Sequence, residues 1–125
     1  MSSFEVILSQ DKVLLAEDEH QIVGYIQYGD ARIPEARPSG DKEIYRLYVL
    51  SGFQNKRISS SLMEIALSEL SGAERIFLDV WEKNSGAIRF YRRYGFETIG
   101  KRPFQTASGI KTGFDLVMVR TSNRL

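Results

Sequence analysis

The chain has 125 residues, 42% hydrophobic and 26% charged, which is the composition of one ordinary globular domain. Its 17 basic and 16 acidic residues leave a formal charge of +1, and this balance argues against a dedicated nucleic-acid surface. Because there is no cysteine, disulfides, thiolate metal sites and cysteine nucleophiles are excluded, and one histidine argues against a metal site built from histidines. We therefore predict a single domain over residues 1–125, with no metal and no nucleic-acid partner.

The first segments are predicted to be strands, with one ambiguity at the start. FEVILSQ fits either the last turns of a helix or a strand. VLLAED and QIVGYIQYG are rich in β-formers, and the polar stretch between them predicts a hairpin turn that exposes His20. No apolar run approaches membrane-spanning length, and the start lacks the basic residues of a signal peptide. We therefore expect a cytoplasmic protein with no membrane partner.

The middle of the chain is predicted to be loop, strand and helix. DARIPEARPSGD holds two prolines and a glycine and reads as a loop, and EIYRLYVL follows as a strand. An amphipathic helix comes next, and Gly72 can end it. Its apolar face has five members: Ile58, Leu62, Ile65, Ala66 and Leu70.

The last third predicts strand, helix and two closing strands. RIFLDVW is a short apolar strand, and Asn84 or Ser85 can cap the helix after it, with Gly95 as its end. The apolar face of that helix holds Ala87, Ile88, Tyr91 and Tyr94. FETIGKR and FDLVMVR are predicted strands, and QTASGIKTG between them is a predicted flexible loop. This element order implies an α/β fold with a sheet of mixed strand direction.

The stretch GFQNKRISSSL, where the first helix begins, has two interpretations. A helix start leaves about four backbone N–H groups without partners and carries about half a positive charge, so it can bind a phosphate. Lys56 and Arg57 would add charge, and three serines would add donors. Serine is also among the commonest helix-capping residues, and most helix starts bind nothing. This stretch alone does not choose between a phosphate site and a capped helix.

Two motifs resemble those of the GCN5-related N-acetyltransferases, the GNAT superfamily. YVLSGFQNKRISSSLM is similar to its acyl-CoA segment, and NSGAIRFYRRYGF is similar to its second signature. RLYVL, VWEKN and DLVM resemble the PaiA-type spermidine/spermine acetyltransferases within the superfamily. The resemblance implies a GNAT-type acyl-CoA N-acyltransferase fold, with a mixed central sheet, helices on both faces and a truncated N-terminal helical region.

The resemblance also implies which residues bind acetyl-CoA as a co-substrate. The backbone after the strand would wrap the pyrophosphate, through Gln54, Asn55, Lys56, Arg57, Ile58, Ser59 and Ser60. The strand residues Leu47, Tyr48 and Val49 would pair with the pantetheine arm and donate an N–H to the thioester carbonyl. Asn84 would bind further along the cofactor, and Tyr91 would lie near its sulfur.

The sequence departs from the family in two ways. Arg57 and Ser59 replace glycines, which allow a backbone to approach a pyrophosphate closely. Arg57 could contact a phosphate directly, or it could fold across the site and block it. The family's usual extra strand and two helices before VLLAED are almost absent, and they build one wall of the acceptor site. Either the chain is truncated or another chain supplies that wall.

Acetyl transfer to an amine requires that the amine lose a proton, because a primary alkyl amine has a pKa of about 10.4. Glu43 is our candidate base, acting through a water, and the alternative is a surface glutamate at a strand edge. Tyr91 is our candidate acid, which would protonate the departing thiolate, and the alternative is an aromatic core residue like Tyr94. Without a cysteine, direct transfer in a ternary complex is expected.

Several further residues have a binding and a structural interpretation. Trp81 could line the acceptor pocket or belong to the core, and Asp79 and Glu82 could attract the cations of a polyamine or face solvent. The three arginines of RFYRRY could form a solvated helix face or contact the adenosine 3′-phosphate.

We conclude that the sequence predicts an acetyl-CoA-dependent N-acetyltransferase acting on a primary amine of a small, polyamine-like molecule. One alternative is a catalytically weakened acyl-CoA-binding or interaction protein on the same fold, and the other is a protein N-acetyltransferase. We also predict a homodimer, because an opening hairpin without its usual cover is an association surface.

Overall fold

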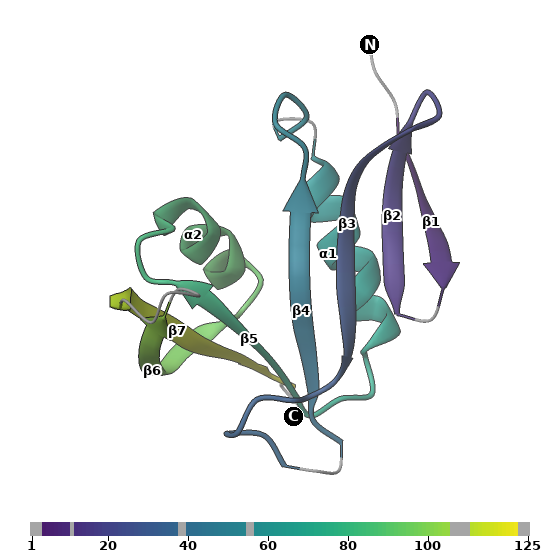
Figure 1. Cartoon of the computed structure of the whole chain (residues 1–125). Coiled ribbons are helices and arrows are strands. Elements are labelled where there is room, and N and C mark those ends of the chain that lie inside the picture. The colour runs from purple at the N-terminus through teal and green to yellow at the C-terminus, as the bar shows by residue number, and fades with distance from the viewer. Residues whose placement is uncertain (1–3, 11, 38–39, 55–56, 106–110, 123–125) are drawn as a thin grey trace. The chain divides into compact units, whose positions relative to one another are not determined.

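The structure, a computed structural model, describes residues 4–10, 12–37, 40–54, 57–105 and 111–122. Within them the chain forms one seven-stranded sheet and two helices (Figure 1). The strand order is β1-β2-β3-β4-β5-β7-β6. The elements are β1 (Glu5–Gln10), β2 (Val13–Asp18), β3 (Gln21–Asp30), β4 (Lys42–Val49), α1 (Ile58–Glu69), β5 (Arg75–Trp81), α2 (Ser85–Arg93), β6 (Glu97–Gln105) and β7 (Lys111–Thr121).

The predicted α/β fold with a mixed sheet is confirmed. β4 pairs with β5 in parallel, whereas β1–β2, β2–β3, β5–β7 and β6–β7 are antiparallel. The ambiguous opening segment is a strand, because Val6, Ile7 and Leu8 pair with β2. The predicted loop at QTASGIKTG was too wide: β6 extends to Gln105 and β7 already begins at Lys111, while residues 106–110 lie outside the described part.

The chain divides into two compact units. The first consists of Met1–Asp30 and Ile44–Gly72, and the second of Ala31–Glu43 and Ala73–Leu125. Each unit has its own buried residues. A single functional domain over residues 1–125 stays a prediction.

In the first unit, α1 packs against β2 and β3. The covered face of these strands includes Leu14, Ala16 and Ile26, all buried. Gly24 lies on the same face, and a Cβ there would come within 2.8 Å of the Tyr48 carbonyl oxygen. This close approach of backbones explains why β3 has a glycine at this position.

The prediction for one residue on the apolar face of α1 was wrong. Ile58, Leu62, Ala66 and Leu70 are buried, but Ile65 is 38% exposed and Met63 is fully buried instead. Met63 and Ile65 are both apolar and lie on opposite flanks of the stripe through Leu62 and Ala66. Helical periodicity therefore marks both flanks, and packing against β2 and β3 decides which one is covered.

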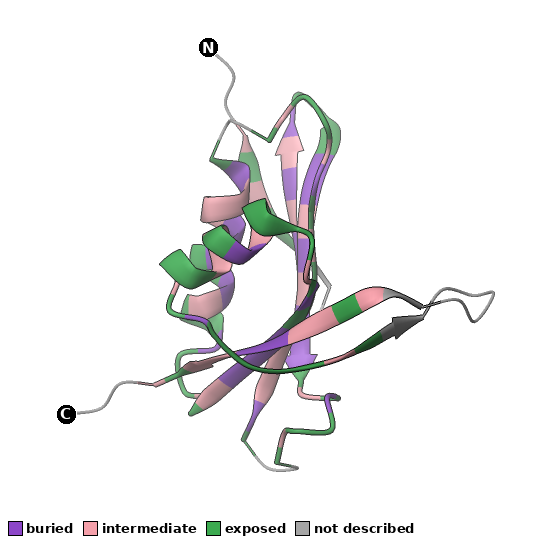
Figure 2. Cartoon of the chain, turned by 90° about the vertical axis from the view of Figure 1, so that its left-hand side faces the viewer, coloured by how far each residue is buried: buried purple, intermediate pink, exposed green. Residues whose placement is uncertain are grey.

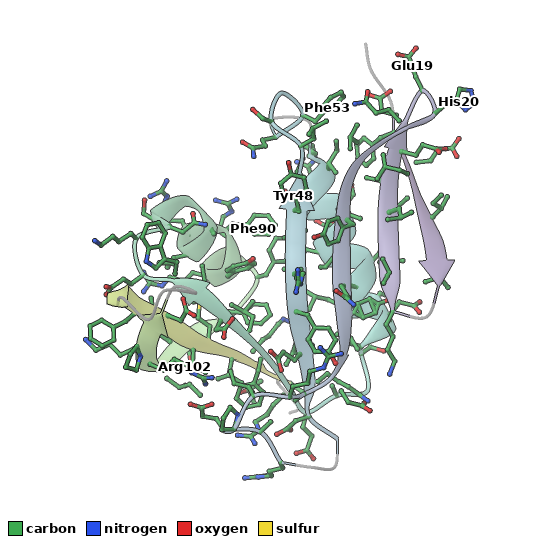
Figure 3. The ribbon with its side chains drawn as sticks, viewed as in Figure 1. Glu19, His20, Tyr48, Phe53, Phe90 and Arg102 are labelled. Carbon is green, nitrogen blue, oxygen red and sulfur yellow. The ribbon has the colours of Figure 1, made fainter. Side chains whose placement is uncertain are left out.

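The hairpin turn between β2 and β3 was placed correctly. Glu19 and His20 form the turn, both with positive φ, and both are exposed. Figure 3 shows their side chains pointing away from the strands at the tip of the hairpin. His20 therefore has the exposed position that the sequence predicted.

In the second unit, Ile33 and Ala36 pack over one face of β5 and β7. Ile33 is buried against Phe77 of β5 and Val117 of β7. Asp41, itself buried, accepts hydrogen bonds from the backbone N–H of Arg37 and from the Arg75 guanidinium at 2.7 and 2.6 Å. Burial alone would raise the pKa of Asp41, but these bonds and the positive charges of both arginines outweigh it and lower that pKa.

α2 has the predicted cap and the predicted end. Asn84 is its N-cap, and Gly95 follows its C-cap with φ of 90°, a conformation that favours glycine. Figure 2 shows that most of this helix is exposed, and Ile88 is its buried residue. In the part of the chain that the structure describes, neither helix has the length and apolar character needed to cross a membrane.

Candidate cofactor and transfer site

The loop after β4 is fixed by bonds to the end of that strand. Phe53 donates its N–H to the Leu50 carbonyl at 2.9 Å, and Gly52 turns the chain with φ of 95°. The Gln54 side chain donates back to the Val49 carbonyl at 3.2 Å. The side chain of Gln54 thus holds the loop, which leaves its backbone for the predicted pyrophosphate contact. Asn55 and Lys56, also predicted to bind cofactor, lie outside the described residues.

α1 begins without help from a side chain of its N-cap. Arg57 holds the N-cap position in the left-handed conformation, φ 62° and ψ 17°, and makes no side-chain capping bond. Its carbonyl accepts the first helical bond from Ser61 at 3.0 Å. The N–H groups of Ile58, Ser59 and Ser60 therefore belong to the first turn, where anions bind, and no acidic side chain lies in that turn.

Arg57 keeps the backbone conformation that glycine adopts freely. A residue with a Cβ loses about 1–2 kcal/mol in this conformation, so the position is strained. Its side chain is exposed. The departure from the family's glycine has therefore not displaced the backbone from a glycine-like turn, and the contacts of the guanidinium with a ligand stay a prediction.

The end of β4 presents alternating side chains. Val49 is buried, Leu47 is half-buried and Tyr48 is 49% exposed. Tyr48 is labelled in Figure 3, and its ring lies 6.0 Å from the ring of Tyr25 on β3. This is the segment predicted to pair with the pantetheine arm, and that role stays a prediction.

In the second unit, Tyr91 lies on α2 within an aromatic group. Its ring is 5.7 Å from Phe90 and 6.0 Å from Phe96, both at steep interplanar angles. Burial raises the pKa of the Tyr91 phenol, and the negative charge of Asp79 raises it further. The hydroxyl therefore keeps its proton at neutral pH, as a general acid must.

Asn84 has a structural task that the sequence had also suggested. Its Oδ1 accepts a hydrogen bond from the Ala87 N–H at 3.2 Å and so caps α2. The side-chain amide nitrogen still offers donors on an exposed residue. A cofactor contact would have to use that nitrogen.

Glu43 also has a structural task. Its Oε1 accepts the backbone N–H groups of Arg32 at 2.7 Å and Ile33 at 3.1 Å. These bonds hold the start of the segment that covers β5 and β7. The structural alternative was a glutamate at a strand edge, and these two bonds give Glu43 such a structural role. Catalysis by Glu43 stays a prediction.

The end of β5 adds residues that the sequence underrated. Trp81 is 42% exposed, so it is not a core residue. Glu82 accepts the Phe114 N–H at 3.1 Å, which fixes its carboxylate to β7. Asp115 stands opposite Trp81 in the sheet, and burial together with the charge of Asp79 raises its pKa. The sequence did not single out Asp115, because its nearness to Asp79 depends on the register of β5 with β7.

The arginines of α2 were predicted either to form a solvated face or to contact a phosphate. Arg89, Arg92 and Arg93 are exposed, as a solvated face requires, and a contact with the adenosine 3′-phosphate stays a prediction. Arg92 and Arg93 lie in the last turn, where positive charge complements the helix dipole.

The predicted site residues form two groups. The first unit holds the loop after β4 and the start of α1, which are suited to bind a phosphate. The second unit holds Tyr91, Asn84 and Glu43, of which Tyr91 is suited to donate a proton. Within the described residues, one unit thus holds a candidate anion site and the other a candidate acid.

Relatives of known family share most of this chain. An uncharacterised N-acetyltransferase of Mycobacterium tuberculosis strain H37Rv is 35% identical over 112 residues, which cover 86% of this chain and 65% of the relative. The spermine/spermidine N(1)-acetyltransferase of Bacillus subtilis is 30% identical over 90 residues, 69% of this chain and 59% of that protein. The chain thus spans about two thirds or less of the length of these relatives.

A solved structure and a family model agree with these relatives. The structure of Arabidopsis thaliana Naa50 in complex with the bisubstrate analogue CoA-Ac-MVNAL superposes with a TM-score of 0.71 and 25% identity, over 89% of this chain and 73% of that one. The family model of the acetyltransferase (GNAT) domain matches residues 9–98. The chain therefore belongs to the GNAT family of acetyltransferases, as its two motifs predicted.

Proposed function

We propose that this protein binds acetyl-CoA and transfers the acetyl group to a primary amine by direct attack in a ternary complex. In that reaction the amine nitrogen forms a bond to the thioester carbonyl carbon, the C–S bond breaks, and the thiolate takes a proton. Acetyl-CoA is thus a substrate that supplies an activated acyl group. The chain's own residues bind the phosphates, orient the amine and move protons.

The observation that carries the proposal is the position of Tyr91, packed between Phe90 and Phe96 where burial raises the pKa of its phenol. A thiolate leaves more readily when an acid protonates it, and a phenol has a basicity comparable to that of a thiol. Burial and the charge of Asp79 keep the Tyr91 hydroxyl protonated well above neutral pH. Tyr91 would give its proton to the leaving sulfur and regain one from solvent or from the attacking amine.

The start of α1 supports acetyl-CoA as the donor. Its first-turn N–H groups, the absence of an acid there, and the strained Arg57 backbone suit a diphosphate. The chain belongs to the GNAT family, and one member that superposes on it, Naa50, was solved with a CoA-containing analogue.

A polyamine-like acceptor is the finer part of the proposal. It is supported by the identity with the spermine/spermidine N(1)-acetyltransferase of Bacillus subtilis. The carboxylates of Asp79 and Asp115, with the exposed Trp81 indole, give the second unit groups that attract cations. A peptide amine is the competing acceptor, because the Naa50 analogue carries a peptide.

A second candidate function is acyl-CoA binding without efficient catalysis. The observation that favours it is the engagement of Glu43, whose Oε1 already accepts two backbone N–H groups. A base must accept a proton from the amine or its water, so Glu43 would have to act through Oε2. On this alternative the site binds acetyl-CoA but activates no amine.

The deciding experiment combines calorimetric titration with a transfer assay. The purified chain is titrated with acetyl-CoA, alongside a variant that carries Arg57→Gly and Ser59→Gly. Free thiol release is then followed with spermidine, spermine and a peptide with a free N-terminus. Micromolar binding with release in the presence of an amine supports the transferase, and the amine that gives release names the acceptor class.

Other outcomes lead elsewhere. Binding without release supports the acyl-CoA binder. Binding by the glycine variant alone would mean that Arg57 blocks the site. Binding by neither protein would leave α1 as a helix that starts without a ligand, and the transferase proposal would be abandoned. A homodimer is part of the proposal, and a cytoplasmic location stays a prediction from the sequence.

A further inference from the structure

The two edges of the sheet differ in how they discourage pairing with another strand. Within the described strands, β1 and β6 are the terminal ones. β6 contains Pro103, Lys101 and two shifts of register, devices by which edge strands avoid extra pairing. β1 has neither proline nor lysine, and its one shift comes after Leu8.

β1 also exposes apolar side chains on both of its faces. Leu8 is 61% exposed and Ile7 is 39% exposed. Val6 and Leu8 stand opposite Ala16 and Leu14 of β2, which are buried, so they lie on the face of the sheet that α1 covers. An edge with free backbone groups and apolar side chains is a template for another strand.

We propose that β1 pairs antiparallel with β1 of a second copy of this chain, with the twofold axis at Ile7. The pairing would join the two sheets edge to edge and give a closed dimer. This inference concerns the first unit alone and does not depend on the proposed acetyl transfer.

Symmetry restricts the register of such a pair. The twofold axis of two antiparallel copies stands perpendicular to the sheet, so each residue keeps its face in both copies. Directly opposite residues share a face, and successive residues of a strand alternate between faces. The axis must therefore lie midway between one residue and the same residue of the second copy, which makes Val6, Ile7 and Leu8 the candidates in the middle of the strand.

Side-chain chemistry selects among these three registers. The register with β2 shifts after Leu8, so regular pairing is expected only from Glu5 to Leu8. An axis at Val6 would place Ile7 opposite Glu5, and an axis at Leu8 would leave Val6 and Ile7 opposite positions beyond the shift. An axis at Ile7 places Ile7 opposite itself and Val6 opposite Leu8 twice. Of the three registers, only this one gives Val6, Ile7 and Leu8 each an apolar partner.

The absence of cysteine allows a direct test by cross-linking. Opposite Cα atoms in an antiparallel pair lie about 4.5–5.5 Å apart, within the range of about 4.4–6.8 Å that a disulfide spans. Ile7→Cys should therefore cross-link to itself under mild oxidation. Leu8→Cys alone should cross-link poorly, whereas a mixture of Val6→Cys and Leu8→Cys should form the mixed dimer. Ile99→Cys, on the exposed part of β6, is the matched control.

Opposite charges placed at Ile7 test the same axis, with the mass of the particle in sedimentation as the readout. Ile7→Lys and Ile7→Glu should each weaken the dimer by at least about tenfold, because like charges then stand opposite each other. An equimolar mixture of the two should restore it, since Lys then faces Glu. Ile99→Lys should leave the sedimentation mass of the natural dimer unchanged.

Three results would overturn the proposal. They are a natural chain that sediments as a monomer at high concentration, cross-linking of Ile7→Cys no faster than Ile99→Cys, and charged variants that remain dimers on their own. Cysteine replaces isoleucine with little change of charge, so cross-linking decides the matter even where a charged variant fails to fold. A dimer that Ile7→Lys leaves intact would assign association to another surface.

Discussion

α1 and α2 both follow a strand and both begin after a polar stretch, yet their first turns are satisfied differently. At α2, the Asn84 side chain accepts one N–H of the first turn and so caps the helix. At α1, Arg57 occupies the cap position without a side-chain bond and in a strained backbone conformation. The contrast teaches that a candidate ligand-binding helix start is recognised by the absence of a side-chain cap from its N-cap residue.

The largest effect on turnover should come from a substitution on α2. Tyr91→Phe keeps the aromatic packing with Phe90 and Phe96 and removes the proton donor. We expect kcat to fall by about 10²-fold or more, in the range of general acid catalysis, while calorimetric binding of acetyl-CoA changes by less than about twofold. Tyr94→Phe on the same helix is the control. Equal turnover in Tyr91→Phe and the natural protein would remove Tyr91 from its role.

The pH profile sharpens the assignment to Tyr91. Its pKa is raised, so the acid remains protonated, and the alkaline fall of kcat should lie above pH of about 10. Asp79→Asn removes a negative charge that raises this pKa, so the fall should move to lower pH. A profile that does not move would show that another group sets the alkaline limb.

An acidic residue in the first turn of α1 should stabilise this helix and weaken the binding of phosphates to it. Ser60→Glu puts a carboxylate in the first turn of α1, where it favours the helix dipole but repels phosphates. We expect acetyl-CoA binding to weaken by about tenfold while the free energy of unfolding rises by about 0.3–1 kcal/mol. Ser85→Glu, in the first turn of α2, should stabilise without that loss, as titration and urea unfolding can establish. Unchanged binding in Ser60→Glu would locate the phosphates elsewhere.

Removing the cap of α2 should have a moderate effect. Asn84→Ala should lower the free energy of unfolding by about 1 kcal/mol, the usual contribution of an N-cap. Asn84→Ser restores the cap but not the amide nitrogen, so it separates stability from binding. If Asn84 contacts the cofactor, Asn84→Ser unfolds like the natural protein in urea and binds acetyl-CoA more weakly. Natural affinity in Asn84→Ser would leave only the capping role.

The smallest effect concerns the strained cap of α1. Arg57→Gly relieves the left-handed backbone but adds chain entropy to the unfolded state, so a net gain below about 1 kcal/mol is expected in urea unfolding. Arg57→Ala, which keeps the strain, should show no such gain. Weaker acetyl-CoA binding in both variants indicates that the guanidinium contacts a phosphate, and tighter binding in both indicates that it blocks the site.

Much of the fold followed from local pattern, because strand alternation, helical spacing and capping residues act over a few positions. The two helices, the hairpin turn at His20 and the cap at Asn84 are examples. What failed depended on distant segments. Met63 rather than Ile65 is buried because of how α1 packs on β2 and β3, and no spacing rule separates the two flanks.

The site residues were predicted mainly from family motifs and only partly from the chemistry of the individual residues. Family resemblance selected Glu43, but its bonds to Arg32 and Ile33 depend on the fold of a loop ten residues away in sequence. Arg57 was predicted either to contact a phosphate or to block the site, and its left-handed backbone was visible only in the structure. A sequence shows which side chain is present, and the surrounding chain decides which conformation that side chain must tolerate.

The ion pair of the buried Asp41 with Arg75 makes the stability of the second unit sensitive to acid. The folded-state pKa of Asp41 is lowered, so its contribution to stability is complete above the unfolded value near 3.9 and is lost as pH falls through the folded value. Acid would therefore release Asp41 from Arg75 of β5 before the strands themselves separate. Native-state hydrogen exchange at falling pH should show the amides of Ile33 and Ala36 losing protection ahead of those that pair β5 with β7, so that the second unit opens in steps rather than all at once.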